Sequence, residues 1–412
     1  MAACCDDNEH DPRAKSVDEA LQIILDASQP VSDMEWLALD AALDRVLAQD
    51  QQASAPIPAW PNSAMDGYAV RSSDGEAARR IVGSAFAGRP FTGSVAVGEA
   101  VRIMTGAIVP EDCDTVVPQE QTERDGDNVH LTGQIRSGVN VRHIGEDLAG
   151  GEIALPAGTL LRPSQIGVLA SLGVSELAVF RRLRVAFFST GDELRPLGSE
   201  LRAGEIYDSN RHTLLALLRR LGVEAIDLGR LPDDPERIST TLRQAGEIAD
   251  VLITSGGVSV GEADYIAELL QSLGTVQFWK MNMKPGRPLA FGRIGTADFF
   301  GLPGNPVSTI VTFYQFVAPA LRKRMGRRAP WTLPRLRLPC ATALRKKPGR
   351  TDFQRGRLVH GPEGLQVTTV KTQSSHILTG MAEAECFLIL PAEAGDLPAG
   401  SIVEVQLLEG MV

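Results

Sequence analysis

Between residues 183 and 322 the chain alternates short apolar runs with longer amphipathic segments, and this alternation restricts its fold more than any other feature. The apolar runs have the length of buried strands and lie at 183–189, 223–228, 251–254, 276–279, 289–291 and 298–302. The amphipathic segments have helical spacing and lie at 211–221, 235–248, 262–273 and 306–322. Strands that alternate with helices predict a mostly parallel, doubly wound α/β sheet.

The regions on either side of this segment follow other patterns. Residues 16–27 and 39–48 have helical spacing, and Ser16 is the expected cap of the first helix. From 66 to 160, short apolar runs separated by Gly, Pro and Asp-Gly predict β-structure, and 162–172 is again helical. After residue 329 short strands punctuated by Pro indicate a small β-domain, which we interpret as a barrel.

Charge and cysteine content exclude several classes of protein. The net charge is −10, from 41 basic and 51 acidic residues, so the chain gains no general electrostatic attraction to nucleic acid. An anionic ligand would need a local basic cluster. No apolar run approaches the ~18 residues of a membrane helix, and the polar start resembles no targeting peptide. Five scattered cysteines predict neither disulfides nor zinc, and reduced thiols favour a cytoplasmic location.

Open α/β sheets bind ligands beyond the carboxyl ends of their strands, and the loops there contain residues suited to anions. Ser255, Gly256 and Gly257 follow the strand at 251–254, where glycine lets the backbone of a loop approach a phosphate closely. The alternative is an ordinary tight turn. Pro303, Asn305 and Pro306 follow the strand at 298–302, and the alternative there is a simple helix start.

Cations and carboxylates gather in the same region of the sequence. Lys280, Lys284 and Arg287 form a basic cluster that suits phosphate or another oxyanion, although a solvated surface is the simpler explanation. Several carboxylates also follow strand ends and would suit Mg²⁺ beside phosphates, with helix caps and loop solvation as the alternative. They are Asp192, Glu193, Asp233, Asp234 and Asp264. These residues predict an enzyme that binds a phosphorylated ligand with Mg²⁺.

Nine short segments, taken in order, resemble the MoeA family of molybdenum cofactor biosynthesis. In the first half they are 61–69 (PNSAMDGYA), 102–106 (RIMTG) and 145–147 (GED). In the second half they are 189–193 (STGDE), 254–262 (TSGGVSVGE), 283–286 (MKPG), 301–306 (GLPGNP), 352–356 (DFQRG) and 375–378 (SHIL). The resemblance covers about residues 15 to 410, and the ordered set is far more specific than any one segment.

The resemblance implies a multidomain α/β plus β protein with a doubly wound, MogA-like molybdopterin-binding domain. Its domains would be an extended linker (1–52 with 145–180), a β-rich lobe (53–144), the α/β domain (181–328) and a C-terminal β-barrel (329–412). The resemblance also implies a homodimer whose cleft joins the α/β domain of one subunit to the lobe of the other. Asp66 and Thr105 would then be catalytic residues brought by the lobe, and Asp147, in the linker, is a further catalytic candidate.

The implied activity is a Mg²⁺-dependent molybdopterin molybdenumtransferase, which inserts molybdate into adenylylated molybdopterin and releases AMP. Lys284, Ser308 and Arg355 are the candidate molybdate ligands. Lys280 and the 255–257 loop would hold the pterin phosphates. Arg287 and the residues of the 303–306 loop would also bind substrate. Asp192, Glu193, Asp233 and Asp264 would bind Mg²⁺ or polarise the attacking oxygen, with Glu193 and Asp264 also counted as catalytic.

Three other functions share parts of this pattern. A MogA-type adenylyltransferase has the α/β domain and a similar Gly-Gly loop, but it needs neither the first 180 residues nor the C-terminal domain. The CinA-like hydrolases share the fold and should lack the signature at 64–67. A gephyrin-like scaffold would need further domains. For the molybdenumtransferase we expect contacts with a MogA-type adenylyltransferase and with acceptor molybdoenzymes, and none with nucleic acid or membranes.

Overall fold

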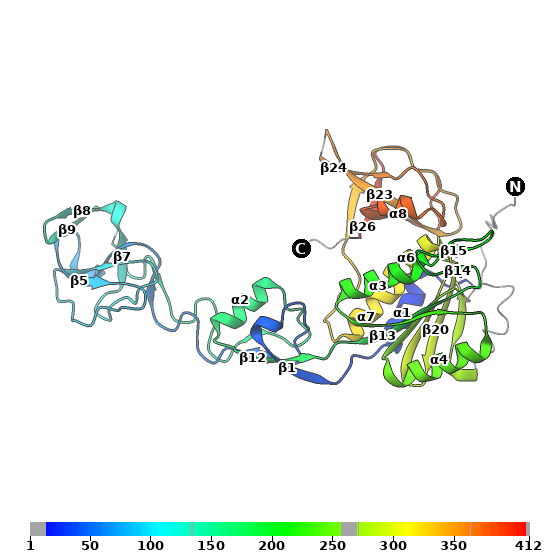
Figure 1. Ribbon diagram of the computed structural model, residues 1–412. Helices are drawn as coiled ribbons and strands as arrows, with labels where there is room; N and C mark the ends of the chain where they lie inside the picture. Colours follow the sequence, from blue (N-terminus) through cyan, green and yellow to red (C-terminus); the bar gives the residue numbers. More distant parts are fainter. Residues whose placement is uncertain (1–13, 133–134, 257–269, 271, 363, 409–412) are drawn as a thin grey trace.

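The chain forms an elongated molecule in which three regions follow one another in space (Figure 1). The computed structural model describes residues 14–408, except 133–134, 257–269, 271 and 363. A β-rich lobe lies at one end, and an α/β region together with a C-terminal β-region lies at the other. A narrow middle region containing α2, β1 and β12 separates them.

The α/β region contains the predicted doubly wound sheet. Its strand order is β16-β13-β17-β21-β20-β18, in which β16, β13, β17 and β21 are parallel. The strands are β13 (Arg184–Thr190), β16 (Glu224–Leu231), β17 (Val251–Ser255), β18 (Gln277–Lys280), β20 (Pro288–Ile294) and β21 (Ala297–Leu302). A short pair, β14 (Leu194–Arg195) with β15 (Ile206–Tyr207), extends from β13. The prediction of a mostly parallel sheet is confirmed.

Helices cover both faces of this sheet. They are α3 (Ser209–Leu221), α4 (Pro235–Ile248), and a continuous helical segment made of α6 (Pro306–Thr312), the π-helical turn η4 (Phe313–Val317) and α7 (Ala318–Arg324). The predicted helix at 262–273 lies mostly outside the described residues. Helix α3 begins two residues earlier than expected, because the Asp208 carboxylate accepts a hydrogen bond from the Arg211 N–H at 3.1 Å and caps it.

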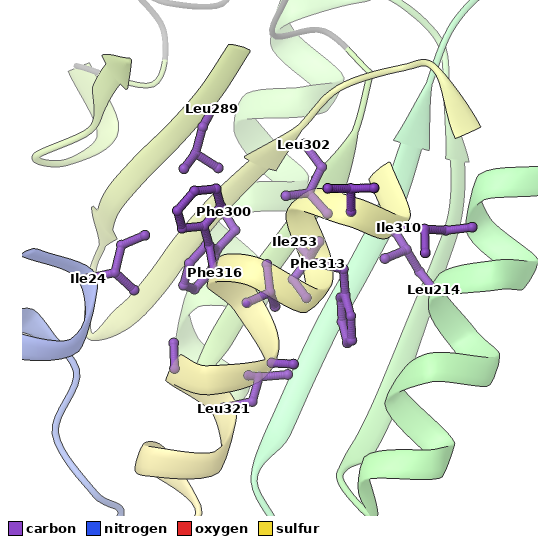
Figure 2. Packing of buried hydrophobic residues seen from close by; sticks show 14 of the residues in the cluster. Ile24, Leu214, Ile253, Leu289, Phe300, Leu302, Ile310, Phe313, Phe316 and Leu321 are labelled. Carbon is purple, nitrogen blue, oxygen red and sulfur yellow. The ribbon is translucent and has the colours of Figure 1, made fainter. Parts of the chain in front are cut away.

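The side chains of each strand alternate between two apolar cores. Phe187, Ile253 and Phe300 face α3 and the 306–324 helical segment, where they meet Phe313 and Phe316 (Figure 2). The alternate residues, such as Phe188, Leu252 and Phe299, face α4 on the other side. Since successive side chains of a strand point to opposite faces, strands this apolar must be covered on both.

The first helix, α1 (Val17–Ala27), packs into the α/β core although the linker was predicted to contain it. The Ser16 hydroxyl accepts from the Glu19 N–H at 3.2 Å, and the Glu19 carboxylate accepts from the Ser16 N–H at 2.9 Å, which confirms the predicted cap. Val17, Ala20 and Ile24 are buried in the same cluster as Phe316. Figure 2 shows Ile24 pointing into it.

The middle region is a set of short two-stranded pairs beside α2 (Pro163–Ser171). They are β1 (Met34–Ala38) with β12 (Glu176–Phe180) and β2 (Gln51–Gln52) with β11 (Ile153–Leu155). A third pair, β3 (Asn62–Ser63) with β10 (Val141–Arg142), belongs to the lobe, where Val141 packs against the apolar cluster around Val101. The prediction of a helix at 39–48 is wrong: only the 3-10 turn η1 (Leu39–Ala41) forms. Asp44 has φ 60°, which a helix does not allow, and Val46 and Leu47 pair with Leu160 and Val179.

The lobe is a six-stranded sheet of order β7-β4-β6-β5-β9-β8. Its strands are β4 (Gly67–Val70), β5 (Arg79–Ala85), β6 (Glu99–Ile103), β7 (Thr115–Pro118), β8 (Thr122–Asp125) and β9 (Asn128–Leu131), with the 3-10 turns η2 (Ser72–Asp74) and η3 (Gln119–Gln121). Apolar clusters lie on both faces, one around Val101 and one around Tyr68. The predicted β-rich character of this segment is confirmed.

The C-terminal region is a sheet of order β19-β23-β25-β26-β22, with β24 paired to β23. Its strands are β22 (Arg335–Pro339), β23 (Thr351–Gly361), β24 (Gly364–Thr369), β25 (Cys386–Leu390) and β26 (Ile402–Leu407), and it also contains α8 (Leu378–Ala382). Strand β19 (Met283–Lys284) comes from the α/β region and ties the two together. An isolated bridge between Cys340 and Val367 curls the sheet, while a closed barrel stays a prediction.

Candidate functional site

Loops that leave the carboxyl ends of β17 and β21 are fastened to each other. The side-chain amide of Asn210 donates to the Ser255 hydroxyl at 2.8 Å and to the Gly304 carbonyl at 2.7 Å. The Gly256 N–H donates to the Leu302 carbonyl at 3.1 Å. The two loops whose sequences suggested anion binding therefore form one unit at this edge of the sheet.

The backbone at Gly256 explains why this position is glycine. Its φ of +95° is a conformation that other residues rarely adopt, and an added Cβ would lie 2.6 Å from the Thr190 carbonyl oxygen. Gly256 thus lies against the end of β13. Asp192 and Glu193 follow that strand end directly in the chain. Gly257 and Asp264 lie outside the described residues, so their predicted roles stay predictions.

Helix α6 begins at this same edge. Asn305 is its N-terminal flanking residue, Pro306 occupies the first turn, and the Asn305 side chain makes no capping hydrogen bond. Ser308 is only 4% exposed. The Pro303 carbonyl accepts from the Thr309 hydroxyl at 2.6 Å, which fixes the loop before the helix. The structure thus brings Pro303, Asn305 and Ser308 together with Ser255 and Gly256.

The basic segment 280–287 crosses from the α/β region to the C-terminal sheet. Lys284 is exposed in β19, whose parallel pairing with β23 places it in register with Asp352. Lys280 ends β18, and Arg287 is half-buried. At Gly286, where φ is +98°, an added Cβ would lie 2.7 Å from the Thr312 hydroxyl, so this segment runs closely along α6. The close approach at Gly286 fixes the path of this basic segment, and its role in binding an anion stays a prediction.

Arg355 is buried in β23, with only 1% of its surface exposed. Its Nη2 donates to the carbonyls of Thr372 and Ser374, at 3.0 and 3.3 Å. Its Nε is buried and has no hydrogen-bond partner in the described part of the chain. Burial lowers the pKa of this guanidinium, and the nearby Asp352 carboxylate opposes that shift. A buried cation with an unused donor suits an anionic ligand.

Three of the predicted metal-binding carboxylates gather at the ends of β13 and β16. Desolvation raises the pKa of Asp233, and the negative charges of Asp192 and Glu193 raise it further. Among the described residues, no group of three or more His, Cys, Asp or Glu side chains has the geometry of a metal site. Asp234 caps α4 by accepting from the Glu236 N–H at 3.0 Å, so the capping alternative holds for it.

The lobe residues form a separate arrangement. Asp66 Oδ1 accepts from both the N–H and the hydroxyl of Thr105, each at 2.7 Å. These bonds, the backbone one first, lower the pKa of Asp66, and the charge of Arg102 adds to the effect. Asp147 is exposed in the turn that contacts Ile57. The lobe and the α/β region occupy opposite ends of the molecule, so one chain does not bring Asp66 to Lys284 (Figure 1).

Asn210 and Asp208 are site residues that the sequence did not reveal. Both belong to the start of α3. Asp208 is 3% exposed and accepts from the Ser189 hydroxyl at 2.5 Å while capping α3. The available signal was an acidic or amide residue before each described helix that starts at this sheet edge, namely Asp208, Asp234 and Asn305, but helix capping explains such residues equally well.

Three family descriptions match successive parts of the chain. "MoeA N-terminal region (domain I and II)" matches residues 15–173, "Probable molybdopterin binding domain" matches 186–323, and "MoeA C-terminal region (domain IV)" matches 337–408. Within the described residues, no helix is long and apolar enough to cross a membrane.

Curated proteins and a solved structure match along nearly the whole length. The molybdopterin molybdenumtransferase of Haemophilus influenzae is 41% identical over 395 residues, covering 95% of this chain and 98% of that protein. The Nostoc sp. protein of the same name is 36% identical, covering 93% and 90%. A crystal structure of the molybdopterin biosynthesis MoeA protein from Pyrococcus horikoshii OT3 superimposes with a TM-score of 0.83 at 28% identity, covering 96% of this chain and all of that one.

Proposed function

The chain belongs to the MoeA family, and from this premise we propose that it is a molybdopterin molybdenumtransferase. It inserts molybdate into adenylylated molybdopterin, whose adenylyl–phosphate bond is cleaved with release of AMP. The observation that carries this proposal is the convergence of two anion-suited loops, a basic segment and a buried arginine at one edge of the α/β sheet. A MogA-type adenylyltransferase is less well supported, because the matches extend to both the N-terminal and the C-terminal regions.

Binding of the two anionic substrates is divided between the loops and the basic segment. The backbone around Ser255 and Gly256 approaches the pterin phosphates, helped by Lys280 and Arg287. Lys284, Ser308 and the unpaired Nε of Arg355 bind molybdate near the start of α6. Molybdate and the phosphates repel each other in water, so fixed positive charges that hold both lower the barrier to their meeting.

Asp192, Glu193 and Asp233 would be the oxygen ligands of Mg²⁺, although in the described structure they do not have the geometry of a metal site. Their mutual repulsion, expressed in the raised pKa of Asp233, is what a divalent cation would relieve. Bound there, Mg²⁺ would neutralise the phosphates and polarise the bond that is cleaved. Glu193 and Asp264 are the candidate catalytic carboxylates, and their part is to orient the attacking oxygen and hold its proton.

The complete site needs two copies of the chain. Asp66 and Thr105 belong to the lobe, at the far end of the molecule from the α/β region, so the lobe of a second subunit would supply them. Asp147, between β10 and β11, is a further candidate. A homodimer with two such clefts follows. We place the enzyme in the cytoplasm, where it would receive the adenylylated pterin from a MogA-type enzyme and deliver the cofactor to acceptor molybdoenzymes.

A single-turnover assay tests this function. Purified protein is mixed with adenylylated molybdopterin, Mg²⁺ and molybdate, and AMP release is followed together with reconstitution of an apo-molybdoenzyme. We expect AMP release that depends on molybdate and yields active cofactor. Synthesis of adenylylated pterin from ATP, without AMP release, would instead establish an adenylyltransferase.

A further inference from the structure

Gln373 lies where the chain leaves the C-terminal sheet after β24. Strand β23 pairs with β24 as far as Gly356, which lies opposite Thr369. One step further, the Val370 N–H still donates to the Arg355 carbonyl at 3.0 Å. The Arg355 N–H should then donate to Val370 in return, as in a regular antiparallel pair. It donates instead to the side chain of Gln373.

The amide of Gln373 replaces the missing strand residue. Its Oε1 accepts from the Arg355 N–H at 2.8 Å, and its Nε2 donates to the Arg355 carbonyl at 2.9 Å and to the Val370 carbonyl at 3.1 Å. A side-chain amide offers the same donor and acceptor as a peptide group, so no main-chain group of Arg355 is left unpaired. The segment after Val370 can therefore leave the sheet without loss of hydrogen bonds.

That segment connects Arg355 to the start of α6. The Arg355 guanidinium donates to the carbonyls of Thr372 and Ser374, on either side of Gln373. The next carbonyl, that of Ser375, accepts from the Val307 N–H at 3.1 Å in the first turn of α6. Gln373 thus fastens the main chain of Arg355 to the same short segment that its side chain binds.

We propose that Gln373 is a positioning residue for the oxyanion site, because its amide fixes the orientation of the Arg355 guanidinium relative to the start of α6. The donors of Arg355 and of α6 come from different regions of the molecule, and segment 372–375 links them through the bonds of Thr372 and Ser374 to Arg355 and of Ser375 to Val307. A loosened segment would move the buried Nε of Arg355 out of line with its ligand. Charge-assisted bonds to an oxyanion depend strongly on such alignment.

The test compares two glutamine variants of the full-length protein. Gln373→Met keeps the size of the side chain and removes the amide. Gln406→Met is the matched control, because buried Gln406 accepts from Gln315 Nε2 at 2.6 Å and so also joins the C-terminal sheet to the α/β region, away from segment 372–375. Calorimetry measures the Kd of molybdate alone and of adenylylated molybdopterin alone.

We expect Gln373→Met to raise the molybdate Kd about tenfold and to change the pterin Kd less than about twofold. Gln406→Met should leave both values within about twofold, even if it lowers the Tm. An unchanged molybdate Kd in Gln373→Met, or an equal rise in Gln406→Met, would overturn the positioning role and indicate a general contribution to the domain junction.

This inference rests on the proposed function for the identity of the oxyanion, and the two fail in different ways. Wild-type protein that binds molybdate but releases no AMP would refute the proposed function, while the Kd comparison would still decide the role of Gln373. Molybdate-dependent AMP release with equal Kd values in wild type and Gln373→Met would refute only the inference. Wild-type protein that binds no molybdate would overturn both.

Discussion

At the scale of single residues, the ends of β13 and β16 place like charges close together. Asp233 is desolvated, and Asp192 and Glu193 add their negative charges, so the pKa of Asp233 is raised. Folding alone does not favour such an arrangement, because each carboxylate would be better solvated in the unfolded chain. Groups kept in an unfavourable electrostatic environment are common at functional sites.

Glu193→Gln tests whether this cluster takes part in the chemistry. The amide keeps the shape of the side chain but cannot carry the charge or accept a proton, so we expect turnover to fall about a hundredfold or more. The Kd of the adenylylated pterin should stay within about twofold, since the proposed contacts to its phosphates come from other residues. Rapid-quench measurement of AMP release, beside equilibrium binding, separates the two effects. Full activity in this variant would remove Glu193 from the catalytic residues.

Asp233→Asn tests the electrostatic strain. A raised carboxyl pKa in the folded state means that the ionised form destabilises the fold, and this penalty disappears as pH falls through the folded pKa towards 3.8. Without Mg²⁺ the variant should therefore have a higher Tm than wild type at neutral pH, and the difference should vanish near pH 4. Adding Mg²⁺ should raise the Tm of wild type more than that of the variant. Equal responses to Mg²⁺ would argue against a cation at this cluster.

At the scale of elements, the parallel order of β13, β17 and β21 brings three functional loops to one edge. Contacts between loops then set their shape, as Asn210 does for Ser255 and Gly304. The same logic applies at the junction with the C-terminal sheet, where β19 pairs with β23 and places Lys284 beside Asp352. The site is therefore a product of sheet topology rather than of any one motif.

Gly256→Ala tests the loop after β17. The new Cβ would lie 2.6 Å from the Thr190 carbonyl oxygen, so the loop must move, and we expect at least about tenfold weaker binding of the adenylylated pterin. Gly229→Ala is the matched control, because its φ of +79° imposes similar backbone strain with no atom within 4 Å of the added Cβ. Calorimetry gives both Kd values. Similar losses in the two variants would attribute the effect to strain rather than to the displaced loop.

At the scale of the whole molecule, the narrow middle region holds the lobe away from the α/β sheet (Figure 1). Arg181 lies where this region meets the sheet: its guanidinium donates to Asp250 at 2.7 and 2.8 Å, and to Asp33 at 2.9 Å. Since Asp33 directly precedes β1 and Asp250 directly precedes β17, Arg181 links the middle region to the sheet. Such an extended shape is compatible with the proposal that the lobe contributes residues to the site of a second subunit.

A mixture of two inactive variants tests whether the site is shared between subunits. Asp66→Asn disables the lobe contribution, and Lys284→Met disables the α/β contribution. If the cleft joins two subunits, each heterodimer has one intact cleft, so co-refolding at equal amounts should restore about a quarter of wild-type activity. The controls are the activity of each variant alone and the activity of the two folded variants mixed under conditions in which subunits do not exchange. No recovery despite proven heterodimers would mean that each site lies within one chain.

The sequence alone determined the local features: the apolar runs that become strands of the α/β sheet, the Ser16 cap, and the helix at 306–324. It also predicted which loops would meet, because parallel strands that alternate with helices place their carboxyl ends together. These features depend on neighbours a few residues apart, which periodicity and capping express directly.

Only the tertiary structure decided the rest. Residues 39–48 have a helical pattern, yet Val46 and Leu47 pair with strands more than a hundred residues away, and these pairings prevent the helix. Helix α1 joins the α/β core, Arg355 is buried in β23, and the amide of Gln373 completes a strand edge. Each outcome depends on groups that are distant in sequence and adjacent in space, and a local pattern contains no information about which distant group will be there.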